Sequence, residues 1–313
     1  MVRKVAGWVL LGVGAFLLVA AALGQFWAPG NAEKTPLEVN TTTRLSGVAQ
    51  KLNPATGQVE EYPVNATSVT KSDTNRSDDD VIAFVSTTCL VIDKGNVPDC
   101  VDAKDPQRRL ITASSDTFAT DRHTAVAVND KKYLAQEAEP HEGLVNKFPF
   151  NVQRKTYDYW DGVLDRAVPA KYDRTERLQG LTTYRFDVDV PSTPAEVLSG
   201  VQGLYTQQKS IWVEPRTGSI VKQTQDESRT LPNGDPLLKL NLEYQPDTVT
   251  KAVHDAGDKA SRLRLLTGVI PIVGLVGGLV LVGLGLWLVL GARRRDGETA
   301  DRSEEASGFS FAR

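Results

Sequence analysis

Two long uncharged and apolar runs stand near opposite ends of the sequence, at residues 6–28 and 265–292. A helix needs about 20 apolar residues to cross the hydrocarbon core of a bilayer. Both runs meet this length, so we predict a transmembrane helix in each. Residues 29–264 contain frequent charges and would form a domain outside the membrane.

The first run also has features of a cleavable signal peptide. Arg3 and Lys4 precede it, and the small residues of "AAALG" offer a cleavage point. However, its apolar core is longer than the usual core of a signal peptide. Trp8 and Trp27 stand near its two ends, where aromatic rings favour the headgroup level. We therefore favour an uncleaved anchor.

Basic residues near the apolar runs predict the orientation. Arg3 and Lys4 precede the first run, and three arginines at residues 293–295 follow the second. By the positive-inside rule, residues 1–5 and 293–313 would be cytoplasmic. The protein would then be a two-pass protein of the cytoplasmic membrane with an extracytoplasmic domain. Three basic residues on the predicted outer side oppose this orientation, but large domains translocate largely regardless of charge: Lys259, Arg262 and Arg264.

Apolar and polar residues alternate with a period of two in the middle of the chain. In "LLKLNLEYQP" and "TTYRFDVDVP" every second residue is apolar, as in a half-buried strand. Turn sequences such as "EPRTG" and "LPNGD" join these runs into hairpins. We predict a mainly β, antiparallel (α+β) domain over residues 29–264, flanked by N- and C-terminal transmembrane helices. A lipid-facing barrel is disfavoured because the polar faces of the strands are charged.

The period changes to three or four just before the second apolar run. Five apolar residues repeat at this helical spacing: Val249, Val253, Ala256, Ala260 and Leu263. We predict a helix here, with Asp247 as its N-cap. The apolar run that follows carries Gly274 and Gly278 at the GxxxG spacing, which permits close helix packing. The partner would be the first helix, which contains Gly7, Gly12 and Gly14, or a second copy of the chain.

The chain has only two cysteines, Cys89 and Cys100. A zinc site would need further ligands at matching spacing, and the CxxC redox motif is absent. Cysteines outside the cytoplasm usually form disulfides, so we predict a Cys89–Cys100 disulfide that closes a hairpin loop. Asp93, Asn96 and Asp99 lie in that loop but do not follow the EF-hand order of calcium ligands.

Charge and motifs narrow the function only slightly. The net charge of -3 gives no basic field for nucleic acid. The common nucleophile, metalloprotease and nucleotide-binding motifs are absent, so we assign no catalytic, cofactor-binding or metal-binding residue and expect no cofactor. "YDYWDG" suggests a core tryptophan flanked by surface acids rather than a sugar site. His123 beside Asp121 and Arg122 suggests an ion-pair cluster at a strand edge rather than a catalytic base.

Several segments in a fixed order resemble a known family. They are "ATDRHTAVAVND", "KFPFNVQRKTYDYWD", "LQGLTTYRFDVDVP" and "IWVEPRTGSIVKQ", between the two apolar runs. Together they resemble a family of actinobacterial envelope proteins labelled the porin PorA family. The resemblance covers nearly the whole chain and implies a membrane protein of the cell envelope. It supplies no catalytic residues.

These observations lead to one preferred function and two alternatives. We expect a non-enzymatic, membrane-anchored envelope protein whose extracytoplasmic β domain binds a lipid-like or hydrophobic ligand or a partner protein. The first alternative is an enzyme that modifies envelope lipids or glycans. The second is a scaffold subunit or pore component, although neither apolar run carries an intramembrane charge. The oligomeric state stays open.

Overall fold

The computed structural model describes the backbone of residues 2–53 and 55–308, and their side chains except those of residues 2, 4 and 291–308. The chain divides into two compact units. One unit contains the two ends of the chain, residues 1–33 and 261–313, and its described residues are mainly helical. The other contains residues 34–260 and is built around a sheet.

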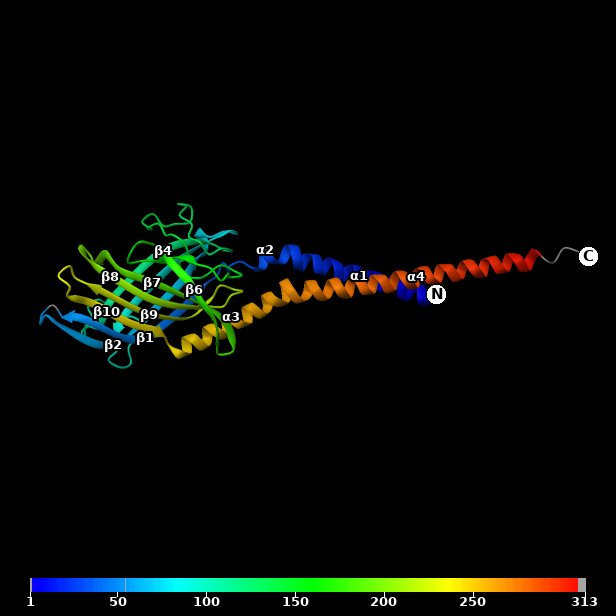
Figure 1. The fold of residues 1–313 in the computed structure, drawn as a ribbon. Helices are drawn as coiled ribbons and strands as arrows, with labels where there is room; N and C mark the ends of the chain where they lie inside the picture. Colours follow the sequence, from blue (N-terminus) through cyan, green and yellow to red (C-terminus); the bar gives the residue numbers. More distant parts are fainter. Residues whose placement is uncertain (1, 54, 309–313) are drawn as a thin grey trace, which may run out of the picture. The chain divides into compact units, whose positions relative to one another are not determined.

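The helical elements follow the apolar runs of the sequence (Figure 1). Their bounds are α1 Val2–Ala22, a π-helical turn Leu23–Trp27, α2 Ala28–Ala32, α3 Pro246–Arg264, a π-helical turn Leu265–Val269 and α4 Ile270–Gly308. Two helical stretches, residues 5–32 and 246–290, are long and apolar enough to cross a membrane. The polar composition of residues 293–313 predicts a disordered tail. The backbone of α4 nevertheless continues as a helix to Gly308, and residues 309–313 lie outside the described part.

Glycines bring α1 and α4 into close antiparallel contact. A Cβ atom built on Gly7 would lie 3.2 Å from the carbonyl oxygen of Gly285, and one on Gly14 would lie 3.0 Å from that of Gly278. Such distances leave no room for a side chain, so the backbones themselves pack together. The glycines of the second apolar run thus meet the first within one chain. Gly12, which we expected on the packing face of the first helix, does not contact α4, because a Cβ built there meets no atom within 4 Å.

The other unit contains ten strands, most of them long. Their bounds are β1 Asn40–Asn53, β2 Gln58–Asp73, β3 Val81–Ile92, β4 Leu110–Asp121, β5 Tyr157–Asp161, β6 Arg166–Leu178, β7 Leu181–Leu198, β8 Val201–Val213, β9 Ile220–Thr230 and β10 Pro236–Tyr244. They form one antiparallel sheet in the order β4-β3-β2-β1-β10-β9-β8-β7-β6-β5. The predicted antiparallel β architecture is therefore confirmed, including the turns at "EPRTG" and "LPNGD".

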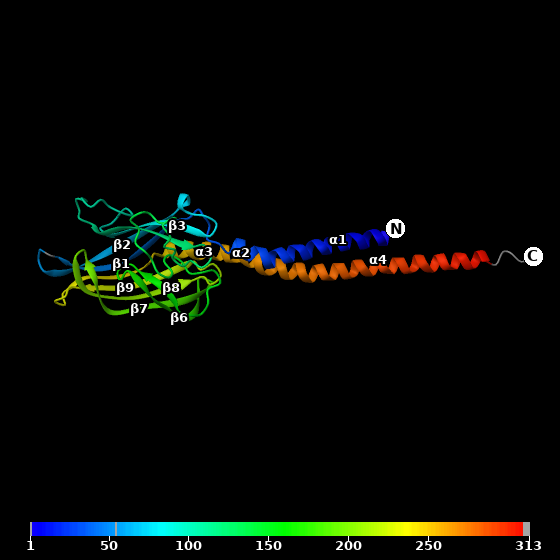
Figure 2. The ribbon, with the colours of Figure 1, turned by 90° about the horizontal axis from the view of Figure 1, so that it is seen from above.

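The sheet curls into a half-barrel, which is visible in two views (Figures 1 and 2). Short irregular segments link its two edge strands at isolated bridges. Thr120 of β4 pairs with Ala127, Val126 pairs with Leu144, and Leu144 pairs with Tyr159 of β5. Gly143 supports this link, because its φ of +66° and the 2.4 Å from a built Cβ to the Asp158 carbonyl oxygen both exclude larger residues.

The two faces of the sheet differ in character. The inner face carries two larger apolar clusters, besides a small one of Ile82, Phe84 and Phe118 on β3 and β4. One lies on β5–β8 and is filled by Leu144, Phe148 and Val152 from the irregular segment. The other lies on β10, β1, β2 and β3. The outer face, at the alternate positions, carries charged residues, among them Asp187, Lys222, Asp226, Lys239 and Glu243.

The first turns of α3 pack on the outer face at one end of the sheet. Val249, Val253 and Ala256 contact Trp212 and Val221, as the helical period predicts. Asp247 is not the N-cap that the sequence predicts, because α3 begins at Pro246 and Asp247 lies within its first turn. Leu45 near the start of β1 pairs with Tyr244 at the end of β10. Both connections from the sheet to the apolar helices therefore leave it at the same end.

Candidate functional site

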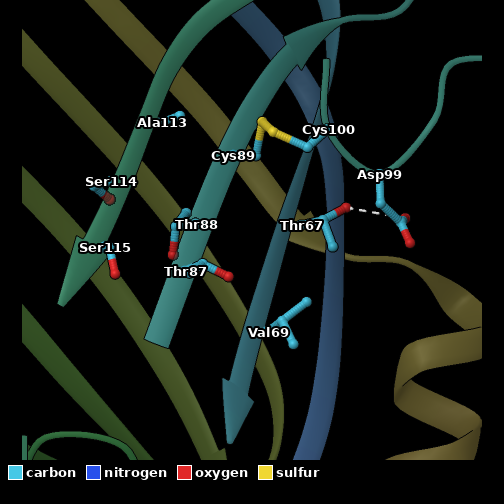
Figure 3. Close-up of a pocket in the computed structure, with 10 residues that line it drawn as sticks. All are labelled: Thr67, Val69, Thr87, Thr88, Cys89, Asp99, Cys100, Ala113, Ser114 and Ser115. Atoms are coloured by element: carbon cyan, nitrogen blue, oxygen red, sulfur yellow. Dashed lines mark hydrogen bonds between the residues drawn. A yellow bond between two sulfur atoms is a disulfide. The ribbon is translucent and has the colours of Figure 1, made fainter. Parts of the chain in front are cut away.

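The predicted disulfide between Cys89 and Cys100 is formed, and it joins β3 to the β3–β4 loop (Figure 3). Asp99, next to Cys100, accepts two hydrogen bonds from the Arg44 guanidinium, at 2.7 Å and 2.6 Å. The Thr67 hydroxyl donates a third to the same carboxylate at 3.3 Å. The Arg44 guanidinium therefore lowers the pKa of Asp99. The disulfide and this ion pair hold the loop against the outer face of β1–β3.

A shallow hollow of about 400 Å³ lies beside the disulfide on the outer side of β2–β4 (Figure 3). It is lined by hydroxyl-bearing and small residues, namely Thr67, Val69, Thr87, Thr88, Cys89, Asp99, Cys100, Ala113, Ser114 and Ser115. Asp99 is the only charged residue of this lining, and Arg44 and Thr67 occupy its oxygens. The hollow therefore suits an uncharged group rather than an ion.

The second candidate site is a polar band on the inner face of β8 and β9. Register pairs Gln207 with Glu227, and Lys209 with Gln225, between these strands. Glu227 accepts hydrogen bonds from Arg229 Nε at 2.7 Å and from Gln225 Nε2 at 2.8 Å. Glu227 is only 6% exposed. Burial of the Glu227 carboxylate is tolerated because the Arg229 and Gln225 donors replace the hydrogen bonds that water would otherwise make.

Tyr205 and Asp161 extend this band toward β5. The Tyr205 hydroxyl donates to Asp161 Oδ2 at 3.1 Å, and both side chains are buried. Burial, together with the charges of Glu227 and Asp161, raises the pKa of Tyr205 well above its ordinary value. Tyr205 therefore remains a neutral hydrogen-bond donor. Asp161 also accepts from the backbone N–H groups of Val163 and Leu164, which positions it at the β5–β6 turn.

Lys209 is the charged member of the band whose hydrogen-bonding capacity is unused. Its ammonium forms no hydrogen bond with any residue in the described part of the chain, and it faces the Tyr159 ring at 5.5 Å. Burial lowers the pKa of Lys209, and the charges of Asp161 and Glu227 oppose that shift. The residue as a whole is nevertheless partly exposed.

A second polar strip lies on the inner face of β2–β4. Thr88 donates to Ser68 at 3.2 Å, and Thr70 lies 3.0 Å from Ser86. Further toward the bridges, His141 Nε2 lies 3.0 Å from Asp116 Oδ2. Burial pulls the pKa of His141 down, but Asp116 outweighs it and raises the pKa above its ordinary value. Around the sheet, apolar clusters thus alternate with polar surfaces.

The structure places the residues of "YDYWDG" differently from the sequence-based expectation. We expected a core tryptophan between two surface acids. Asp158 is exposed as expected, but Asp161 is only 3% exposed and Trp160 is half-buried. The reason is the β5–β6 turn, whose backbone N–H groups and Tyr205 satisfy the Asp161 carboxylate. Asp158 and Asp161 do not form a pair.

His123 does not join an ion-pair cluster with its neighbours. Asp121 instead accepts the backbone N–H groups of His123 and Thr124 at a turn. Arg122 is 8% exposed and donates to three backbone carbonyl oxygens, of Thr35, Asp78 and Asp79. In place of the expected salt-bridge cluster, Arg122 mainly binds backbone carbonyl groups. It thereby joins Thr35, near the start of the sheet unit, to the β2–β3 turn.

Within the described residues no group of three His, Cys, Asp or Glu side chains is arranged to hold a metal ion. The inner polar band offers hydrogen-bond donors and acceptors. Sequence reasoning missed Lys209 and Glu227. Their signal in the sequence is a run of polar residues at the inner-facing positions of "TQQKSI" and "KQTQDES". Which positions face inward is known only from the register of the two strands.

Comparison with known proteins gives one family. A search of the curated proteins finds no match. The family model described as Porin PorA matches residues 6–287, which include the whole half-barrel and most of both apolar runs. The match agrees with the order of segments noted in the sequence. The chain therefore belongs to the Porin PorA family.

Proposed function

We propose that the protein is a non-enzymatic cell-envelope protein, anchored in the cytoplasmic membrane at both ends, whose extracytoplasmic half-barrel binds a lipid-like ligand on its inner face. The single observation behind this proposal is Lys209. An ammonium group inside a folded domain is costly unless it is paired or solvated. Lys209 is partly exposed and has no hydrogen-bond partner in the described part of the chain, so it is available to a ligand.

The surroundings of Lys209 determine which class of ligand fits. Apolar clusters flank the polar band on both sides, on β5–β8 and on β10, β1, β2 and β3. Gln207 and Gln225 provide amide groups, and Glu227 and Asp161 balance the positive charges of Lys209 and Arg229. An amphiphile with a hydroxyl- or phosphate-bearing head and an apolar chain matches this combination better than an ion or a flat aromatic compound.

The proposal is tested with the full-length protein purified in a mild detergent. Lipids retained after detergent exchange are extracted and quantified per mole of protein by mass spectrometry, for the wild type, Lys209→Met and Lys239→Met. Lys239 lies on the outer face and serves as the matched control. We expect retained lipid to fall in Lys209→Met only. Equal lipid content in all three proteins would exclude the inner face as the binding site.

The family description also raises the possibility of a pore, and the charge distribution speaks against one formed by the sheet. A barrel that crosses lipid needs an outward-facing apolar band. Here the outer face carries Asp187, Asp226, Lys239 and Glu243. Any pore would have to be formed by several copies of the apolar helices. Ion conductance of the purified protein in planar bilayers tests this second candidate.

A further inference from the structure

The edge strand β4 presents an open backbone edge. Its residues pair with β3 on one side. On the other side, bridges to the irregular segment begin only at Thr120. Among the described residues, none pairs with the free side of β4 between Thr112 and Thr117. Ala113, Ser114 and Ser115 are exposed. The backbone groups of this stretch are therefore accessible to a partner.

The direction of these groups follows from the two-residue repeat of a strand. The Ala119 carbonyl accepts from Val128 N–H, and the Asp121 N–H donates to the Val126 carbonyl, both on the free side of β4. The register with β3 is regular from Asp121 back to Thr112. In a regular strand, alternate residues direct their N–H and C=O groups to the same side. Ala113, Ser115 and Thr117 therefore point theirs outward.

The opposite edge of the sheet is protected. β5 covers β6 only as far as Ala170. The uncovered part of β6 carries alternating charges, and Arg174 forms ion pairs with Asp173 and Glu176. Charges on an edge strand prevent pairing with other chains. By contrast, the open stretch of β4, residues 110–117 or "LITASSDT", contains no proline or glycine and a single charge, Asp116, which pairs with His141. An open edge with so little protection is a template for strand addition.

The hollow beside the disulfide extends to this edge strand. Ala113 and Ser115 belong to its lining, together with Val69, Thr87 and Cys89. Figure 3 shows these residues on the three adjacent strands and the disulfide beside them. A strand added next to β4 would place alternate side chains over Ala113 and Ser115. A long apolar side chain at one of these positions would reach the mouth of the hollow.

We propose that the open edge of β4, from Ala113 to Thr117, docks an extended, uncharged segment of a partner protein, which carries an apolar side chain toward the disulfide hollow. Backbone hydrogen bonds to Ala113, Ser115 and Thr117 hold the segment, and the hollow selects the side chain. This is the mode of recognition in which backbone pairing supplies affinity and a pocket supplies specificity.

A second copy of the chain fits this edge less well. Antiparallel pairing of β4 with itself would turn the two sheets end for end, so that the ends at which β1 begins and β10 finishes would point in opposite directions. Two chains anchored in one membrane, as proposed above, would then have to bend one of these connections back. A parallel pair related by a two-fold axis would place equal residues side by side, whereas parallel hydrogen bonding requires an offset of one residue. The occupant is therefore a different protein.

The test uses full-length protein in detergent and a fluorescent short peptide that alternates threonine with leucine. Binding is measured by fluorescence anisotropy. Ser115→Pro removes an outward N–H without removing a bond to β3, a substitution that edge strands tolerate. Ser115→Ala is its matched control, because it keeps the N–H. We expect binding to the wild type and to Ser115→Ala, and about tenfold weaker binding to Ser115→Pro.

A second probe keeps the test decisive if Ser115→Pro does not fold. The same peptide, N-methylated at alternate amides, cannot pair with a strand edge and should not bind the wild-type protein. An all-threonine peptide should bind more weakly than the leucine peptide, and Val69→Trp, which fills the hollow, should remove that difference. Equal binding of the methylated and unmethylated peptides would overturn the proposal. Dimerisation that Ser115→Pro abolishes would overturn it too, because a second copy would then occupy the edge.

Discussion

Gly14 and Gly278 face each other across the helix pair, with 3.0 Å between a Cβ built on Gly14 and the Gly278 carbonyl oxygen. A Cβ on Gly278 would lie 2.9 Å from the Gly14 carbonyl oxygen. Neither position accepts a side chain unless the helices separate. In lipid, helix association depends on such close packing rather than on the hydrophobic effect. The contact between these two glycines therefore sets the separation of α1 and α4.

Gly14→Val should push α1 and α4 apart. The separation is read by electron paramagnetic resonance between spin labels at two exposed positions, Phe16→Cys and Val276→Cys. We expect the distance between the labels to increase in the Gly14→Val background. Gly12→Val is the matched control, since a Cβ there meets open space. Equal distances in the two backgrounds would show that the glycine contact does not hold the helices together.

Removal of the Cys89–Cys100 disulfide should destabilise the sheet unit. The bond spans 11 residues of sequence, and closing a loop of similar length stabilises the folded state by about 3 kcal/mol in the chain-entropy model. We expect the double variant Cys89→Ser, Cys100→Ser to melt several degrees below the wild type, measured by circular dichroism of the full-length protein. Reductant should lower the melting temperature of the wild type alone. A variant with the wild-type melting temperature would mean that the Arg44–Asp99 ion pair holds the loop unaided.

Arg122→Lys should also destabilise the sheet unit, although the charge is conserved. The Arg122 guanidinium donates from Nε to the Thr35 carbonyl at 2.7 Å and from Nη1 to those of Asp78 and Asp79. A lysine ammonium cannot reproduce this fork, and a buried carbonyl left without a donor is costly. The expected loss is about 2 kcal/mol in denaturant unfolding. Lys132→Arg, at an exposed ion pair with Asp78, should change stability little.

Lys147 should give the protein a pH-dependent stability in the alkaline range. Burial, and then the charge of Lys259, lowers the pKa of Lys147 to about 7 from its ordinary value of 10.5. Above about pH 7 the unfolded chain still binds the proton that the folded chain has released, so stability rises with pH. Below that pH both states carry the proton and this contribution is constant.

The variant Lys147→Met isolates this contribution. At pH 7 and below, the variant should be more stable than the wild type, because the wild type carries a buried ammonium near Phe150. The difference in melting temperature should shrink as the pH rises from about 7 to about 10. A difference that is independent of pH would show that Lys147 does not titrate in this range.

The period of the sequence predicted the elements well because each strand or helix buries one face. Leu240 and Leu242 of the alternating run lie in an inner cluster, and Val249, Val253 and Ala256 of the helical run pack on the sheet. The two apolar runs form helices, and the two cysteines pair. The strands and helices follow from the local spacing of apolar residues. The disulfide follows because the sequence contains only two cysteines.

The candidate site was not predictable in the same way. Lys209, Tyr205 and Glu227 meet Asp161 only because β8, β9 and β5 take a particular register across the sheet. The linear sequence shows Lys209 as an ordinary strand lysine and Asp161 as a surface acid beside a tryptophan. Likewise, the open edge of β4 follows from its position at the end of the strand order, which no local pattern encodes.

The central proposal, a lipid-like ligand on the inner face near Lys209, is tested most directly by photolabelling the full-length protein with a fatty acid that carries an alkyl diazirine. Labelled residues are mapped by peptide mass spectrometry, with Lys209→Met as the comparison. We predict adducts on inner-face residues of β8–β10, such as Gln225 and Leu240, and their loss in the variant. Adducts restricted to the apolar helices, identical in both proteins, would contradict the proposal.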